Sequence, residues 1–179
     1  RLTGRMVAIN LEPAAVRNDG EKSVWSLTEG RRATVENAKK AADMGVDMIV
    51  LTGNPGVGVD NRAITKALAD LNEAVGDRVI LTAGKMHASG ILSEAGEKIL
   101  TKEDAETFIE AGADVLLLPA PGTVPGFTIE HATELIKTAH NKGVLAMTTI
   151  GTSQEGADEE TIRQIALMCK MAGADIHHI

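Results

Sequence analysis

A repeat of about 30 residues constrains the fold of this chain more than any other feature. Glycines that follow apolar-periodic stretches recur at spacings of 31, 36, 31 and 30 residues: Gly45, Gly76, Gly112, Gly143 and Gly173. The first, third and fifth of them begin a Gly-x-Asp pattern. Glycine suits the left-handed position just past a helix C-terminus, and a short apolar run follows each one. A period that holds one helix and one buried strand is a βα unit.

The repeat predicts six strands and five helices in strict alternation. The expected strands span residues 6–11, 48–52, 79–83, 115–118, 145–150 and 176–179. The expected helices span residues 32–44, 61–74, 102–110, 129–141 and 159–171, with N-caps at Asp60, Thr101, Thr128 and Asp158. The strands are apolar runs without clean alternation, which is typical of a parallel sheet covered by helices.

Two α/β architectures fit this order, an open doubly wound sheet and a (β/α)8 TIM barrel. A barrel unit of about 31 residues matches the observed period. Polar residues also stand at the ends of several strands, whereas an open sheet gathers its ligand groups at one switch point. We therefore expect a TIM barrel. Since the chain starts at Arg1 and stops inside an expected strand, we expect residues 1–179 to be a single partial barrel domain. It would lack about two βα units upstream, and the loop and helix after the last strand.

The charge and composition of the chain exclude some classes of binding partner. The chain has 25 acidic and 18 basic side chains, a net charge of -7, and only 2% aromatic residues. Nucleic-acid binding needs a basic face and stacking platforms, so we expect no nucleic acid partner. The sequence has no apolar run of membrane-spanning length and no signal peptide, and its single Cys169 excludes an intramolecular disulfide. A cytoplasmic protein with no membrane partner is the default expectation.

Strand alternation predicts which side chains share a face. Counting from the Gly-x-Asp aspartates places one set of residues on the barrel interior: Met48, Val50, Thr52, Asn54, Val115, Leu117, Ile176 and His178. His177 then points to the helix layer. On the first strand Ala8, Asn10 and Glu12 share a face, and on the third Ala83, Lys85 and His87 do; we expect both sets to reach the barrel mouth.

Lys85, His87 and Glu12 are the expected catalytic residues. A lysine in a barrel mouth can form a Schiff base, or hold an enolate or phosphate as a point charge. A nearby histidine or carboxylate can move protons. The alternative is a loop lysine that simply reaches solvent. Two long loops follow the first and third strands, and loops of this length are often functional.

Two glycine-containing loops are candidates for binding an anion. The segment GNPGVG at residues 53–58 contains Asn54 and Gly56, and its backbone amides can approach a phosphate at a helix start. The segment GTSQEG at 151–156 contains Ser153 and Gln154 and follows the expected seventh barrel strand, where barrels often bind phosphate. An ordinary βα turn is the alternative for the first loop, and the acidic Glu155 and Asp158 count against phosphate at the second.

Asn10, Glu12 and His178 can together supply oxygen and nitrogen ligands to a divalent ion such as Mg²⁺. These residues come from separate strand ends, so their spacing alone does not indicate a metal site. The metal requirement stays open at this stage, and Asn10 and His178 are also candidates for binding substrate.

Four segments resemble one family: VAINLEP at 7–13, TAGKMHASG at 82–90, LPAPGT at 118–123 and GTSQEGA at 151–157. The whole chain is similar to an uncharacterised family of bacterial barrel proteins whose members are labelled phosphoenolpyruvate phosphonomutase-like or haloacid dehalogenase-like hydrolases. The chain has neither the Asp-x-Asp motif of haloacid dehalogenases nor the lysine- and cysteine-containing gating loop of the phosphonomutase and isocitrate lyase group. We therefore do not expect a hydrolase.

Two functions remain open from the sequence. The first is an enzyme, of phosphonomutase or lyase type, that acts on a small phosphorylated or carboxylated metabolite by enolate or C–C/C–P bond chemistry. The second is a barrel that binds such a metabolite as a sensor or scaffold without turnover, since a barrel fold alone does not separate the two. In either case we expect a homo-oligomer.

Overall fold

A computed structural model describes residues 4–14, 27–86, 99–150 and 157–178. The strands are β1 (Ala8–Leu11), β2 (Met48–Leu51), β3 (Ile80–Gly84), β4 (Val115–Pro119), β5 (Leu145–Thr149) and β6 (Ile176–His178). The helices are α1 (Val35–Asp43), α2 (Asn61–Val75), α3 (Lys102–Glu110), α4 (Ile129–Asn141) and α5 (Glu159–Ala172), with short 3-10 turns η1 (Glu29–Arg31) and η2 (Pro55–Val57).

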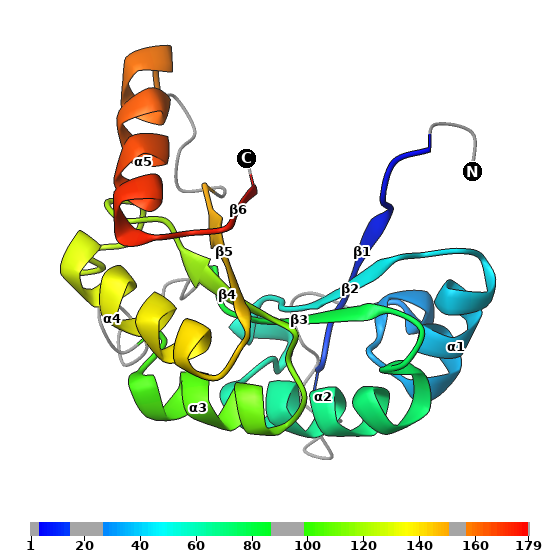
Figure 1. Ribbon diagram of the computed structural model, residues 1–179. Helices are drawn as coiled ribbons and strands as arrows, with labels where there is room; N and C mark the ends of the chain where they lie inside the picture. Colours follow the sequence, from blue (N-terminus) through cyan, green and yellow to red (C-terminus); the bar gives the residue numbers. More distant parts are fainter. Residues whose placement is uncertain (1–3, 15–26, 87–98, 151–156, 179) are drawn as a thin grey trace.

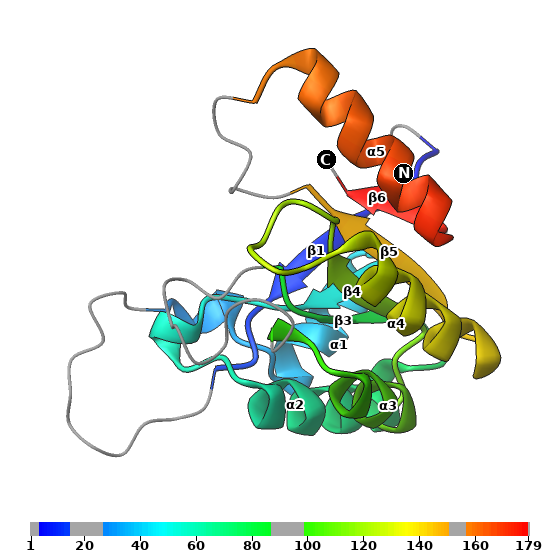
Figure 2. The same ribbon diagram turned by 90° about the vertical axis from the view of Figure 1, so that its left-hand side faces the viewer.

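The six strands form one parallel sheet in the order β1-β2-β3-β4-β5-β6. The sheet curls into a partial barrel with the helices on its convex side, and β1 and β6 form its two edges (Figures 1 and 2). Each strand pairs with the next one in the chain, so the sheet has no switch point. The predicted barrel class is confirmed. None of the described helices is long and apolar enough to cross a membrane.

Side-chain caps fix where the helices begin. All four predicted N-caps accept a backbone N–H from the first turn: Asp60 from Ala63, Thr101 from Asp104, Thr128 from His131 and Asp158 from Thr161. The first helix starts three residues later than predicted. Thr34 caps it by accepting the Asn37 N–H at 3.2 Å, and the preceding residues form η1 instead.

The aspartates of the Gly-x-Asp repeat fasten neighbouring strands together at their amino ends. Asp47 accepts the Val7 N–H at 2.9 Å, Asp114 accepts the Leu81 N–H and Asp175 accepts the Ala146 N–H, the last two at 2.8 Å. In each case the backbone N–H of the aspartate also donates to the carbonyl of the same partner residue. We call this paired contact the aspartate clasp. The repeat therefore has a structural role at the end of the barrel opposite the mouth.

The two faces of the sheet bury different sets of side chains. The inner cluster consists of Met48, Val115, Leu117 and Met147, with Val50, Ile80, Met86 and Ile176 packed against it. This confirms the predicted interior face on β2, β4 and β6. The prediction for β3 is wrong for Ala83, which packs in the larger cluster between sheet and helices. The register explains the difference, because the inward-facing Met48 lies opposite Ile80 and the outward-facing Leu51 lies opposite Ala83. Ile80 and Ala83 are three residues apart, so strand alternation places them on opposite faces of the sheet.

Gly84 ends β3 at a place where no side chain fits. A Cβ atom there would lie 1.9 Å from the carbonyl oxygen of Leu117 on β4. The glycine therefore lets β3 and β4 approach closely just before Lys85.

Candidate functional site

Lys85 lies directly after β3, at the carboxyl edge of the sheet. Its side chain is only 4% exposed, and it is the only buried lysine in the part of the chain that the structure describes. The side chains before and after Lys85 point to different faces of the sheet. Ala83 packs against the helix layer, and Met86 packs against the inner cluster. Alternation from β3 therefore does not by itself carry Lys85 into the barrel mouth. A buried lysine at the edge of the sheet where barrels place their chemistry marks the position as a candidate site.

Glu12 is the second buried charge at this edge, with 5% exposure. Its carboxylate Oε1 accepts a hydrogen bond from Nη2 of Arg31, the last residue of η1. The alternation that pairs Glu12 with Asn10 stops at Leu11, where β1 ends. Beyond that point the Glu12 side chain lies against Gly53 and Val59, since a Cβ added to Gly53 would lie 3.0 Å from Glu12 Cγ.

Gly53 follows β2 and lies beside Glu12. The β2–β3 register itself ends at the pair of Leu51 and Ala83, two residues before Gly53 and Lys85. A Cβ atom at Gly53 would lie 3.1 Å from Glu12 Oε2, so the missing side chain leaves space for the Glu12 carboxylate.

The predicted binding residues Asn54 and Gly56 bond to each other. Asn54 Oδ1 accepts the Gly56 N–H at 2.7 Å and caps η2. Gly58 closes the same turn with a φ of 90°, a conformation that favours glycine. The geometry at Gly58 fits an ordinary βα turn, and anion binding by residues 53–58 stays a prediction.

Of the remaining candidates, the two that the structure describes lie on opposite edge strands of the sheet. Asn10 is exposed on β1, and His178 is exposed on β6, the opposite edge strand. His178 shares its register position with Thr149 and Pro119, two residues beyond the inward Met147 and Ile176. His87, Ser153 and Gln154 lie outside the described residues.

His177 points to the helix layer, as the register predicts. Its Nδ1 lies 2.9 Å from the hydroxyl oxygen of Thr148. Thr148 also hydrogen-bonds the buried Cys169 of α5, and burial raises the pKa of that thiol. Thr148 therefore lies between the exposed His177 of β6 and Cys169 of α5.

Within residues 4–14, 27–86, 99–150 and 157–178, no group of three or more His, Cys, Asp or Glu side chains is arranged to hold a metal ion. Glu12 bonds to Arg31, and Asn10 and His178 lie on the two edge strands β1 and β6. A divalent-ion site formed by Asn10, Glu12 and His178 stays a prediction.

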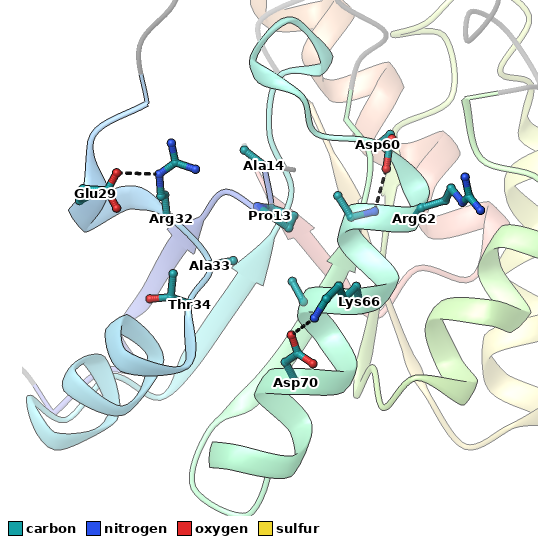
Figure 3. A pocket seen from close by; sticks show the side chains of 12 residues that line it. Pro13, Ala14, Glu29, Arg32, Ala33, Thr34, Asp60, Arg62, Lys66 and Asp70 are labelled. Atoms are coloured by element: carbon teal, nitrogen blue, oxygen red, sulfur yellow. Dashed lines mark hydrogen bonds and ion pairs between the residues drawn. The ribbon is translucent and has the colours of Figure 1, made fainter. Parts of the chain in front are cut away.

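The described residues also line cavities away from Lys85 and Glu12. One of about 780 Å³ lies outside the barrel between α1 and α2, and its acidic side chains all have partners: Glu29 bonds Arg32, Asp70 bonds Lys66, and Asp60 caps Ala63 (Figure 3). Another, of about 990 Å³, lies over the amino ends of the strands and is lined by inner-face residues such as Met48, Val115 and Met147. Neither contains Lys85 or Glu12.

The chain matches a known family along its whole length, over residues 1–179, and that family is described as a domain of unknown function, DUF7916. The chain belongs to the DUF7916 family. No curated protein sequence matches it.

Solved structures with a similar fold are barrel enzymes. Deoxyribose phosphate aldolase from Aeropyrum pernix, described as tetrameric, has a TM-score of 0.61 at 19% identity, over 96% of this chain and 60% of the aldolase. An archaeal fructose-1,6-bisphosphate aldolase, solved with its catalytic Lys bound to the carbinolamine intermediate, has a TM-score of 0.57 at 18% identity, over 78% of this chain and 52% of that protein. A 2,3-dimethylmalate lyase of the PEP mutase/isocitrate lyase superfamily has a TM-score of 0.58 at 12% identity, over 96% of this chain and 57% of the lyase.

These likenesses establish the barrel fold of the DUF7916 chain. The chain spans about 60% or less of the length of these three proteins.

Proposed function

We propose that this DUF7916 protein is an enzyme that acts on a small phosphorylated or carboxylated metabolite by enolate or C–C/C–P bond chemistry, with Lys85 binding or activating the substrate. The observation that carries the proposal is the burial of Lys85 directly after β3, at the edge where barrels place their chemistry. The enzymes of similar fold add support, since two are aldolases and one belongs to the PEP mutase/isocitrate lyase superfamily.

Lys85 can act in two ways. As a free amine it can attack a substrate carbonyl, and loss of water then gives an imine that withdraws electrons from the neighbouring C–C bond. As an ammonium it can stabilise the negative charge of an enolate or bind a phosphate. The second way needs no covalent bond to the protein.

Glu12 and His87 are the proposed proton carriers beside Lys85. The bond from Arg31 gives Glu12 a fixed orientation in its buried position. A carboxylate in this position can accept a proton from a bound substrate. His87 enters the proposal from its place in the sequence, two residues after Lys85.

Replacing Lys85 by Met tests the proposal, because methionine retains much of the length and removes the charge. Native mass spectrometry of the intact protein first identifies the metabolite that co-purifies with it. We expect Lys85→Met to lose affinity for that metabolite and to lose turnover, whereas Lys102→Met, an exposed lysine at the start of α3, retains both. If Lys85→Met retains full affinity and full turnover, the proposal fails.

Borohydride distinguishes the two ways in which Lys85 can act. A hydride reduces an imine to a stable secondary amine, so peptide mapping after treatment with the metabolite and borohydride locates the adduct. An adduct at Lys85 indicates imine chemistry, and loss of binding in Lys85→Met without any adduct indicates an electrostatic role. A bound metabolite that the intact protein returns unchanged after prolonged incubation would favour the sensor or scaffold function.

A further inference from the structure

Two hydrogen bonds join Arg31 to Glu12 at the end of β1, and a third joins Glu12 to Ala33. Its guanidinium donates to the Glu12 carboxylate, and its backbone carbonyl accepts the Glu12 N–H at 2.7 Å. The Glu12 carbonyl in turn accepts the N–H of Ala33 at 3.0 Å. The short turn η1 that carries Arg31 is therefore held against the carboxyl edge of the sheet, although it is separated from β1 in the sequence.

The two partners of this ion pair are unequally exposed. The Glu12 side chain is 6% exposed and the Arg31 side chain is 64% exposed. In the pair of Arg78 and Asp43 the values are 42% and 69%, so that both partners face solvent. Arg31 Nη2 is thus bonded to Glu12, while most of the Arg31 side chain is exposed to solvent.

A guanidinium has five N–H donors in a planar fork, and the bond to Glu12 leaves most of them available. The buried carboxylate offsets the positive charge, so what Arg31 presents is chiefly a set of directed donors. Such a fork matches the oxygens of a carboxylate or phosphate, and its anchoring reduces the entropy that is lost on binding.

We infer that Arg31 binds the anionic group of the substrate, a carboxylate or a phosphate, while Glu12 positions Arg31. This inference rests on the proposed function, because it assigns a substrate contact to the same edge of the barrel. It also gives Glu12 a positioning role in addition to any proton transfer.

Binding of two simple anions to the intact protein tests the inference. Malonate represents a carboxylate substrate and inorganic phosphate a phosphorylated one, and both are titrated by calorimetry at constant ionic strength. We expect the wild-type protein to bind at least one of them. Arg31→Gln should weaken that binding about tenfold or more, because charge-assisted hydrogen bonds are lost. Arg31→Lys, which retains the charge without the fork, should fall between Arg31→Gln and wild type.

Arg78→Gln is the matched control, since Arg78 is an ion-paired arginine near the amino end of β3. It should bind the anions as the wild type does. The inference is overturned if Arg31→Gln retains wild-type affinity, if the wild type binds neither anion, or if Arg78→Gln loses binding to the same extent. Thermal melts check folding, and if Arg31→Gln does not fold, wild-type affinity in Arg31→Lys overturns the inference.

The outcome can be separated from that of the proposed function. If Lys85→Met loses turnover and Arg31→Gln binds anions normally, only the role of Arg31 fails. If Lys85→Met retains full metabolite affinity and turnover while Arg31→Gln loses anion binding, the edge is an anion-binding site and the catalytic proposal fails.

Discussion

Asp175 combines the aspartate clasp with a charge partner. Its Oδ2 accepts the Ala146 N–H at 2.8 Å and lies 2.9 Å from His140 Nε2 at the end of α4. Partial burial opposes ionisation, but the hydrogen bonds from His140 and Ala146 outweigh it and lower the pKa of Asp175 below its usual 3.8. The folded state therefore favours the ionised form more strongly than the unfolded state does.

This lowered pKa predicts a specific pH dependence. The contribution of Asp175 to the free energy of unfolding is fully present above pH 3.8, the ordinary value, and is lost as the pH falls through the lower folded-state pKa. We expect Asp175→Asn to lower the Tm at neutral pH and the difference from wild type to shrink in acid below pH 3.8. Thermal melts across this range provide the measurement. Asp70→Asn, which removes an exposed pair with Lys66, should change the Tm much less at every pH.

Single residues also mark the limit of what the sequence could predict. The face of Met48, Val50 and Ile176 followed from the Gly-x-Asp register, because local alternation determines it. The phase of β3 did not, since that strand has no such aspartate from which to count. The bond between Arg31 and Glu12 joins the two ends of a long loop, and no local pattern indicates such a contact.

Among the helices, α3 has the most complete N-terminal cap. The Thr101 side chain accepts the Asp104 N–H, and the Asp104 carboxylate accepts both the N–H and the hydroxyl of Thr101. Two backbone donors that the helix itself leaves unpaired are thereby satisfied. Caps of this kind are readable from sequence, which explains why the predicted bounds of α3 and α4 match the structure.

Removing this cap should destabilise the protein by a measurable amount. Thr101→Ala removes the hydroxyl that bonds to Asp104, and we expect the free energy of unfolding to fall by about 1 kcal/mol. Urea titration followed by circular dichroism provides the measurement. Thr101→Ser retains the hydroxyl and should stay near the wild-type value, and an equal loss in both variants would argue against the cap as the cause.

Across the whole molecule, the curled sheet leaves both edge strands and part of its interior uncovered. The cavity over the amino ends of the strands is lined mainly by apolar inner-face residues, and Met6 and Leu145, 60% and 48% exposed, lie at its border. Unpaired strand edges and exposed apolar surface both favour association with another chain.

We therefore predict that residues 1–179 expressed alone associate in solution. Light scattering coupled to gel filtration should show a mass well above the 18.8 kDa of one chain. Met6→Lys and Leu145→Lys place charges on the apolar border and should shift the distribution toward monomer. A monomeric wild-type chain with one cooperative melt would contradict the prediction.

The aspartate clasps also divide the barrel into pairs of strands. They join β1 to β2, β3 to β4 and β5 to β6, whereas the register sets the buried valines Val79 and Val144 at the corresponding position of β3 and β5. Duplicating or deleting a single βα unit would set two aspartates or two valines side by side and interrupt this alternation. In this chain the structural repeat is therefore a tandem of two βα units, and we expect other members of the family to differ in length by two units at a time.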